Sequence, residues 1–144
     1  TGLGDYVRGG GNVMYMGGTG VGSPSAGGAA GEAAYSNTFL NQFGLSFASV
    51  YNGLSTVNTT GFDGQNPFGP ALFTGVSSVF ANNGQDIGMV STPSNVTNQI
   101  FHDANQNGVF AAAIVTPEPA SLTLLATGLV GIFGAARRRS RSSV

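Results

Sequence analysis

The sequence predicts a small α/β domain in residues 1–115, followed by a single C-terminal transmembrane helix. Helical and strand-like patterns alternate in the first half of the chain, and turns rich in Gly and Asn separate them. An uncharged run then occupies residues 120–136, with arginines directly behind it. The 144 residues include no cysteine, which excludes a disulfide framework, a thiolate metal site and a thiol nucleophile.

The first predicted elements are a helix and a short strand. Leu3, Tyr6 and Val7 have helical spacing, and the glycines at 9–11 should end this helix. Residues 13–16 are apolar and lie between two glycine-rich loops, so we expect a short strand there.

The middle of the domain carries the clearest pattern. Residues 33–43 place Ala34, Thr38 and Phe39 near one face and precede a glycine, which predicts a helix that ends there. Residues 45–51 alternate weakly and should form a strand that ends at an Asn-Gly turn.

Three further strands are expected after a long loop. Residues 58–70 have the composition of a loop, and two strands at 76–80 and 87–90 should be joined by a turn at 82–84. Residues 108–115, GVFAAAIV, form the last apolar run before the tail and predict the last strand of the domain.

Three segments carry a resemblance to a known domain. DYVRGGGNVMYMGG, NTFLNQFGLSF and GPALFTGVSSV resemble the middle and end of a glutamine-amidotransferase-like domain, which has a flavodoxin-like α/β fold. The resemblance implies a partial flavodoxin-like or similar sheet-plus-helix domain. Because the chain starts at Thr1 without an export signal, we expect an N-terminally truncated fragment of a longer protein. The Cys-His pair of active members cannot be assigned, since His102 is the only histidine and there is no cysteine.

One loop resembles half of a calcium site. Asp103, Asn105 and Asn107 fall at ligand positions 1, 3 and 5 of an EF-hand-type loop, with glycine at position 6. The glutamate expected at position 12 is replaced by Ile114, so any calcium binding should be weak. An Asx-rich turn before the last strand explains the same residues equally well.

The C-terminal run has nearly the length of a membrane span. Seventeen helical residues extend about 26 Å, against about 30 Å for the hydrocarbon core of a bilayer. By the positive-inside rule, the basic cluster behind the run should stay cytoplasmic; it consists of Arg137, Arg138, Arg139 and Arg141. The alternatives are a buried core helix or a nucleic-acid-binding tail, but the run lacks a polar stripe and the cluster lacks interleaved aromatic residues.

The end of the chain resembles a known sorting signal. Pro117, Glu118 and Pro119, then an uncharged helix, then arginines at the C-terminus resemble the PEP-CTERM sorting signal of Gram-negative bacteria. This resemblance implies an exported protein that is held in the inner membrane until an exosortase, a membrane-embedded cysteine transpeptidase, cuts near the motif. The implied partners are exosortase, inner-membrane lipid and exopolysaccharide. The implied final location is the cell surface or the extracellular space.

Charge supports an exported domain. Six acids and Arg8 alone precede the run, so residues 1–119 carry a formal charge of −5 and the four arginines give the tail +4. Because the residues form no recognised catalytic constellation, we expect a surface or matrix protein without catalytic activity, cofactor or nucleic-acid partner. The alternative is the C-terminal part of a secreted amidotransferase-like enzyme or hydrolase whose catalytic residues lie upstream.

Overall fold

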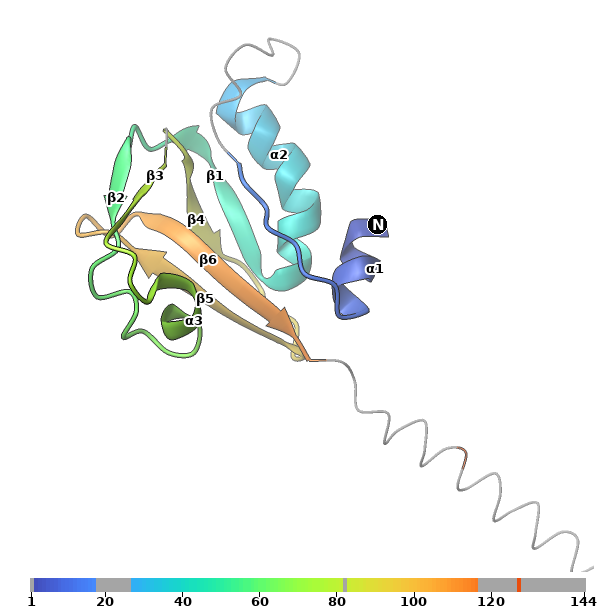
Figure 1. The fold of residues 1–144 in the computed structure, drawn as a ribbon. Coiled ribbons are helices and arrows are strands. Elements are labelled where there is room, and N and C mark those ends of the chain that lie inside the picture. Colours follow the sequence, from blue (N-terminus) through green and yellow to red (C-terminus); the bar gives the residue numbers. More distant parts are fainter. Residues whose placement is uncertain (1, 18–26, 82, 117–126, 128–144) are drawn as a thin grey trace, which may run out of the picture.

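A computed structural model of the protein describes residues 2–17, 27–81, 83–116 and 127 (Figure 1). The described part is a small mixed domain of sheets and helices, which confirms the sheet-plus-helix part of the prediction. In chain order its elements are α1 (Gly2–Arg8), α2 (Gly28–Leu40), the 3₁₀ turn η2 (Asn41–Phe43), β1 (Leu45–Tyr51), β2 (Thr56–Asn58), α3 (Gly69–Phe73), β3 (Ser78–Phe80), β4 (Gln85–Met89), β5 (Val96–His102) and β6 (Gly108–Val115).

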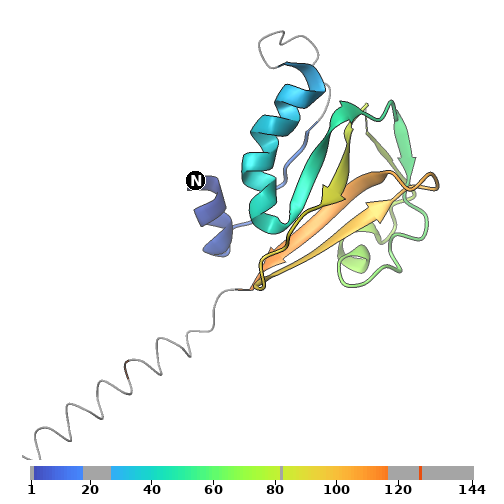
Figure 2. The same ribbon diagram turned by 180° about the vertical axis from the view of Figure 1, so that it is seen from behind.

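All described strand pairs are antiparallel. β1 pairs with β4, β2 with β3, and β5 with β6. The flavodoxin-like expectation is wrong for the described residues, because that fold needs neighbouring parallel strands joined by crossover helices. Here α2 packs against β1, and β5 and β6 follow each other as a hairpin (Figures 1 and 2).

The β5–β6 hairpin lies between two hydrophobic clusters. Ala33, Leu40, Leu45 and Phe47 form the first cluster, with α2 and β1, and Val57, Phe62, Phe73 and Phe101 form the second. Ala111 and Ala113 pack against the first cluster, whereas Phe110 and Ala112 pack against the second. Since successive side chains of a strand point to opposite faces, β6 contributes to both clusters, and its sequence is apolar at nearly every position.

The predicted helix at 33–43 and strand at 45–51 are both present. The helix begins earlier, at Gly28, and its last predicted turn is the 3₁₀ turn η2. Gly44 ends it with φ 74°, a left-handed conformation that glycine adopts without steric cost. The Asn37 side chain then bonds the Phe47 backbone twice, through Nδ2 to the carbonyl at 3.1 Å and through Oδ1 to the N–H at 2.7 Å.

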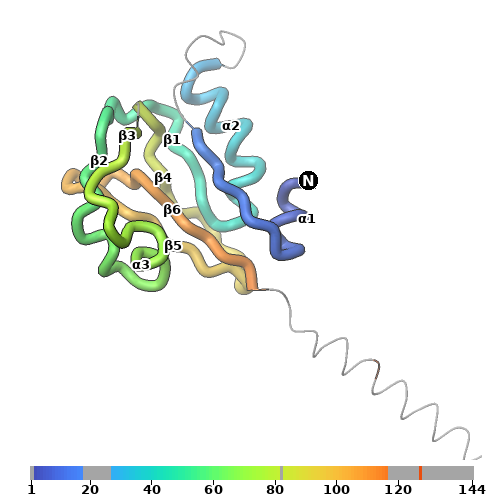
Figure 3. Tube along the Cα trace, viewed as in Figure 1, coloured from blue at the N-terminus to red at the C-terminus, as the bar shows by residue number. Residues whose placement is uncertain are grey.

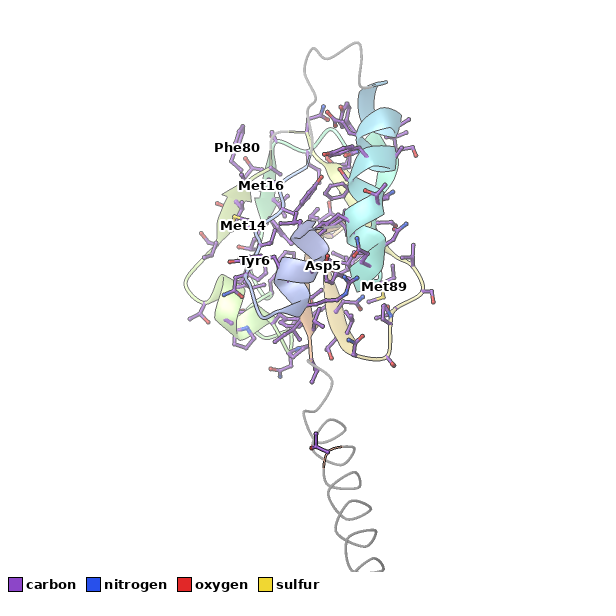
Figure 4. The ribbon with its side chains drawn as sticks, turned by 90° about the vertical axis from the view of Figure 1, so that its right-hand side faces the viewer. Asp5, Tyr6, Met14, Met16, Phe80 and Met89 are labelled. Atoms are coloured by element: carbon purple, nitrogen blue, oxygen red, sulfur yellow. The ribbon has the colours of Figure 1, made fainter. Side chains whose placement is uncertain are left out.

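The expected strand at 13–16 is wrong, because this segment is extended but pairs with no described strand. The Tyr15 side chain of this segment packs between α2 and β1 instead. Its ring centroid lies 5.5 Å from that of Phe39, and its hydroxyl donates to Ser36 Oγ at 2.9 Å. Figure 3 shows the segment running beside both elements. Met14 and Met16 point away from the core and are 87% and 85% exposed (Figure 4).

The sequence did not predict β2, α3 and β5. β5 is the most consequential, because it pairs with β6 along its whole length. Its polar residues concealed it: Asn98 Nδ2 donates to the Phe43 carbonyl at 2.8 Å, and Gln99 Oε1 accepts from the Phe68 N–H at 3.2 Å. These amides hold the strand against neighbouring loops, so a pattern of apolar residues does not reveal it.

Candidate functional site

The open end of the β5–β6 hairpin is where the folded domain meets the tail. Val96 lies opposite Val115, and the Thr116 N–H donates to the Asn95 carbonyl at 2.8 Å. In an antiparallel ladder, a backbone bond between the two residues just outside a pair shows that the pair itself is non-hydrogen-bonded. Side chains lie closest in pairs of this type. Both valines are half-buried.

The residue after Thr116 is a proline, which favours the extended geometry that Thr116 needs to continue β6. On the β5 side the chain turns just before Val96, whose N–H donates to the Pro93 carbonyl at 3.0 Å. Among the described residues, the Asn95–Thr116 bond is the last bond of the ladder at this end. Forming that bond is worth about 0.5–1.5 kcal/mol, and a cross-strand side-chain pair adds about 0.2–1 kcal/mol.

The predicted sorting residues lie outside the described residues. This holds for Pro117, Glu118 and Pro119, for the arginine cluster, and for residues 120–136 apart from Thr127. Within the described part of the chain, no helix combines the length and the apolar character needed to cross a membrane. The predicted transmembrane helix at 120–136 thus receives no support from the described structure.

The opposite end of the hairpin holds the predicted calcium residues. Asp103 Oδ1 accepts from the backbone N–H groups of Asn105 and Asn107, each at 2.9 Å, and Oδ2 accepts from Asn107 Nδ2 at 3.0 Å. The Gln106 N–H donates to the Asp103 carbonyl at 3.1 Å, and Gln106 has φ 66°. The structure thus shows the Asx-rich turn that was the alternative interpretation.

The hydrogen bonds within this turn stabilise the ionised form of the Asp103 carboxyl. Desolvation acts to raise the pKa of the Asp103 carboxyl, but the bonds from Asn107 and Asn105, together with His102, hold that pKa below its usual range. No group of three or more His, Cys, Asp or Glu side chains in the described ranges is arranged to hold a metal. Calcium would have to displace the Asn107 amide from the carboxylate, and weak calcium binding here stays a prediction.

A buried polar contact that the sequence did not signal joins three elements. The Gln85 side chain is 4% exposed, and its Nε2 donates to the carbonyls of Ala29 at 2.7 Å and Ala48 at 2.8 Å. The Tyr51 hydroxyl lies nearby in the β1–β4 register and donates to Glu32 Oε2 at 2.9 Å. Both contacts tie α2 to the β1–β4 pair, so their evident role is structural.

Comparison with known families identifies the tail. Residues 115–139 match the model of the PEP-CTERM protein-sorting motif. The chain carries a PEP-CTERM sorting motif. No curated protein and no solved structure matches the chain. The PEP-CTERM motif confirms the resemblance of the tail and indicates an exported protein that exosortase targets.

The PEP-CTERM motif and the folded domain overlap by two residues. The match begins at Val115, the last residue of β6, and includes Thr116, whose N–H bonds to Asn95. The motif therefore starts at the final residue of β6, the last strand among the described residues.

Proposed function

We propose that this chain is a non-catalytic protein that an exosortase processes at its tail and leaves at the cell surface or in the extracellular matrix. The observation that carries the proposal is the PEP-CTERM motif, which begins at the last residue of β6, a strand that pairs with β5 at every residue except Val109. Cleavage near residues 117–119 would leave both core clusters intact, because every residue of these clusters precedes the motif.

The charge distribution supports this arrangement. Six acids lie in residues 1–119 and four arginines follow residue 136. By the positive-inside rule, the arginines remain on the cytoplasmic face of the inner membrane while the acidic domain lies outside. A helix through residues 120–136 would join the two until processing, with inner-membrane lipid around it and exopolysaccharide as a partner of the released domain.

The amidotransferase-like alternative has lost the resemblance on which it depended. The antiparallel pairing of the described strands does not fit the flavodoxin-like sheet of that group. His102 lies exposed at the end of β5, beside the Asx turn.

The experiment that tests the proposal uses Glu118. Changing Glu118→Gln keeps the size of the side chain but removes its charge, so the processed product should fall severalfold while the unprocessed chain stays with the membrane fraction. Mass spectrometry and fractionation in a host with an exosortase measure both. Asp63→Asn removes an exposed carboxylate from the folded domain and serves as the control.

Two outcomes would count against the proposal. Equal processing of wild type and Glu118→Gln would contradict recognition through the carboxylate. A wild-type chain that is neither processed nor associated with membranes would contradict the sorting function as a whole.

A further inference from the structure

The overlap between β6 and the sorting motif creates a competition for backbone groups. Thr116 uses its N–H to bond Asn95, and Val115 is paired with Val96. The same two residues open the PEP-CTERM match. A cleft that binds an extended chain uses main-chain N–H and C=O groups in the manner of an added strand. The Thr116 N–H cannot bond both Asn95 and such a cleft.

The β5 side of this contact is anchored more firmly than the β6 side. The Val96 N–H donates to the Pro93 carbonyl at 3.0 Å, which closes a turn just before β5. Asn98 Nδ2 donates to the Phe43 carbonyl at 2.8 Å and to Thr92 Oγ1 at 3.2 Å. On the β6 side, Ile114 is 54% exposed and Thr116 is exposed as well. When the contact opens, the end of β6 is therefore the part that moves.

We propose that Val96–Val115 together with the Asn95–Thr116 hydrogen bond, here called the terminal pair, limits the access of exosortase to the chain before Pro117 and must open for processing. The inference rests on the proposed function. Its residues are positioning residues, because they act by holding the substrate strand and not by contacting reacting atoms. The pair keeps the first two residues of the motif, Val115 and Thr116, bonded to the β5 side until the enzyme competes for their backbone groups.

A reversible cross-link tests this directly. Non-hydrogen-bonded pairs bring Cα atoms to about 4.5 Å, within the range of about 4.4–6.8 Å that a disulfide spans. The chain has no cysteine, so Val96→Cys combined with Val115→Cys forms a single defined bridge. The full chain, oxidised or reduced, is incubated with membranes that contain an exosortase, and the cleaved product is followed with time.

We expect the oxidised double variant to be processed more than about tenfold more slowly than its reduced form, because the bridge prevents the pair from separating. Reductant should restore the rate. Val115→Cys alone carries the same change within the motif and should show no effect of oxidation. Wild type with and without reductant controls for the enzyme's own cysteine.

A second variant loosens the terminal pair without altering the motif. Val96→Ala removes most of the cross-strand contact from the β5 side, and processing should become about two- to fivefold faster, in line with the worth of one such contact. Circular dichroism shows whether each variant retains the fold.

Each outcome has a definite meaning. Equal rates for the oxidised and reduced double variant, with wild type processed, would overturn the terminal-pair inference and leave the sorting function standing. A Val96→Ala variant processed at the wild-type rate would also contradict it. If wild type itself is not processed, the sorting function fails and this inference fails with it.

Discussion

The two ends of the β5–β6 hairpin are held by different means. At the closed end, one carboxylate accepts three hydrogen bonds within the turn from Asp103 to Asn107. At the open end, one backbone bond and two half-buried valines hold the strands together. The same ladder is therefore fixed firmly where the chain reverses and weakly where the sorting motif begins. Opening of the hairpin should therefore start at its open end.

The largest effect should come from the ring that anchors the hairpin as a whole. Phe101 is fully buried, with its centroid 4.8 Å from that of Phe73 and 5.5 Å from that of Phe62. Phe101→Ala should lower the free energy of unfolding by about 3–5 kcal/mol, because it leaves a cavity in the second cluster. Chemical denaturation measures this loss.

The matched control for this change is Phe80→Ala, since Phe80 is 71% exposed. Its effect should stay within about 0.5 kcal/mol. Similar losses for the two variants would contradict the placement of Phe101 at the centre of the second cluster.

A smaller effect is expected from breaking the closed end alone. Asp103→Asn removes the charge and one acceptor of the turn, so the variant should be less stable than wild type at neutral pH. The folded pKa of Asp103 lies below its ordinary value of 3.8, so its stabilisation is present above that pH and is lost as the pH falls through the folded pKa. Unfolding free energies between pH 7 and 2 should therefore converge for wild type and variant at the acidic end. A constant difference across this range would show that the charge contributes nothing.

The smallest expected effect is a difference in amide hydrogen-exchange rate between the two ends of the hairpin. Val96→Ala should speed the exchange of the Thr116 amide by about two- to fivefold, the loss expected for one cross-strand contact. The Asn107 amide, which donates to Asp103, should exchange as in wild type. Hydrogen exchange followed by NMR resolves both positions. Equal acceleration at both would mean that the hairpin opens as one unit, and the contrast between its ends would disappear.

The sequence predicted the elements whose ends are marked by a glycine or by a turn signal. The strand β1 lies between Gly44 and the turn at Asn52, and both its ends were placed correctly. The helix α2 starts earlier than expected because its lead-in of glycine and alanine carries no apolar periodicity. The strand β5 was missed because its polar side chains serve as tertiary contacts.

Strand direction and pairing could not be predicted from element order. Alternating helix and strand patterns predicted an α/β domain without specifying which strands pair, and the pairing partner of β1 is β4, far along the chain and antiparallel. For the tail, three independent sequence features predicted the PEP-CTERM motif, and the family match confirms it. The overlap of this motif with a paired strand depends on the pairing of Asn95 and Val96 with the end of β6. No local sequence pattern around Val115 predicts that pairing.

The alternation of β6 between the two hydrophobic clusters has a consequence for how the domain loses its structure. Ala111 and Ala113 pack against one cluster, and Phe110 and Ala112 pack against the other. Disrupting either cluster therefore also disturbs β6, the strand that both clusters share. The described domain should therefore unfold in a single cooperative transition, although it contains two cores. For an exported chain without any cysteine to cross-link it, such all-or-none behaviour keeps partly opened forms, the ones that proteases attack, rare.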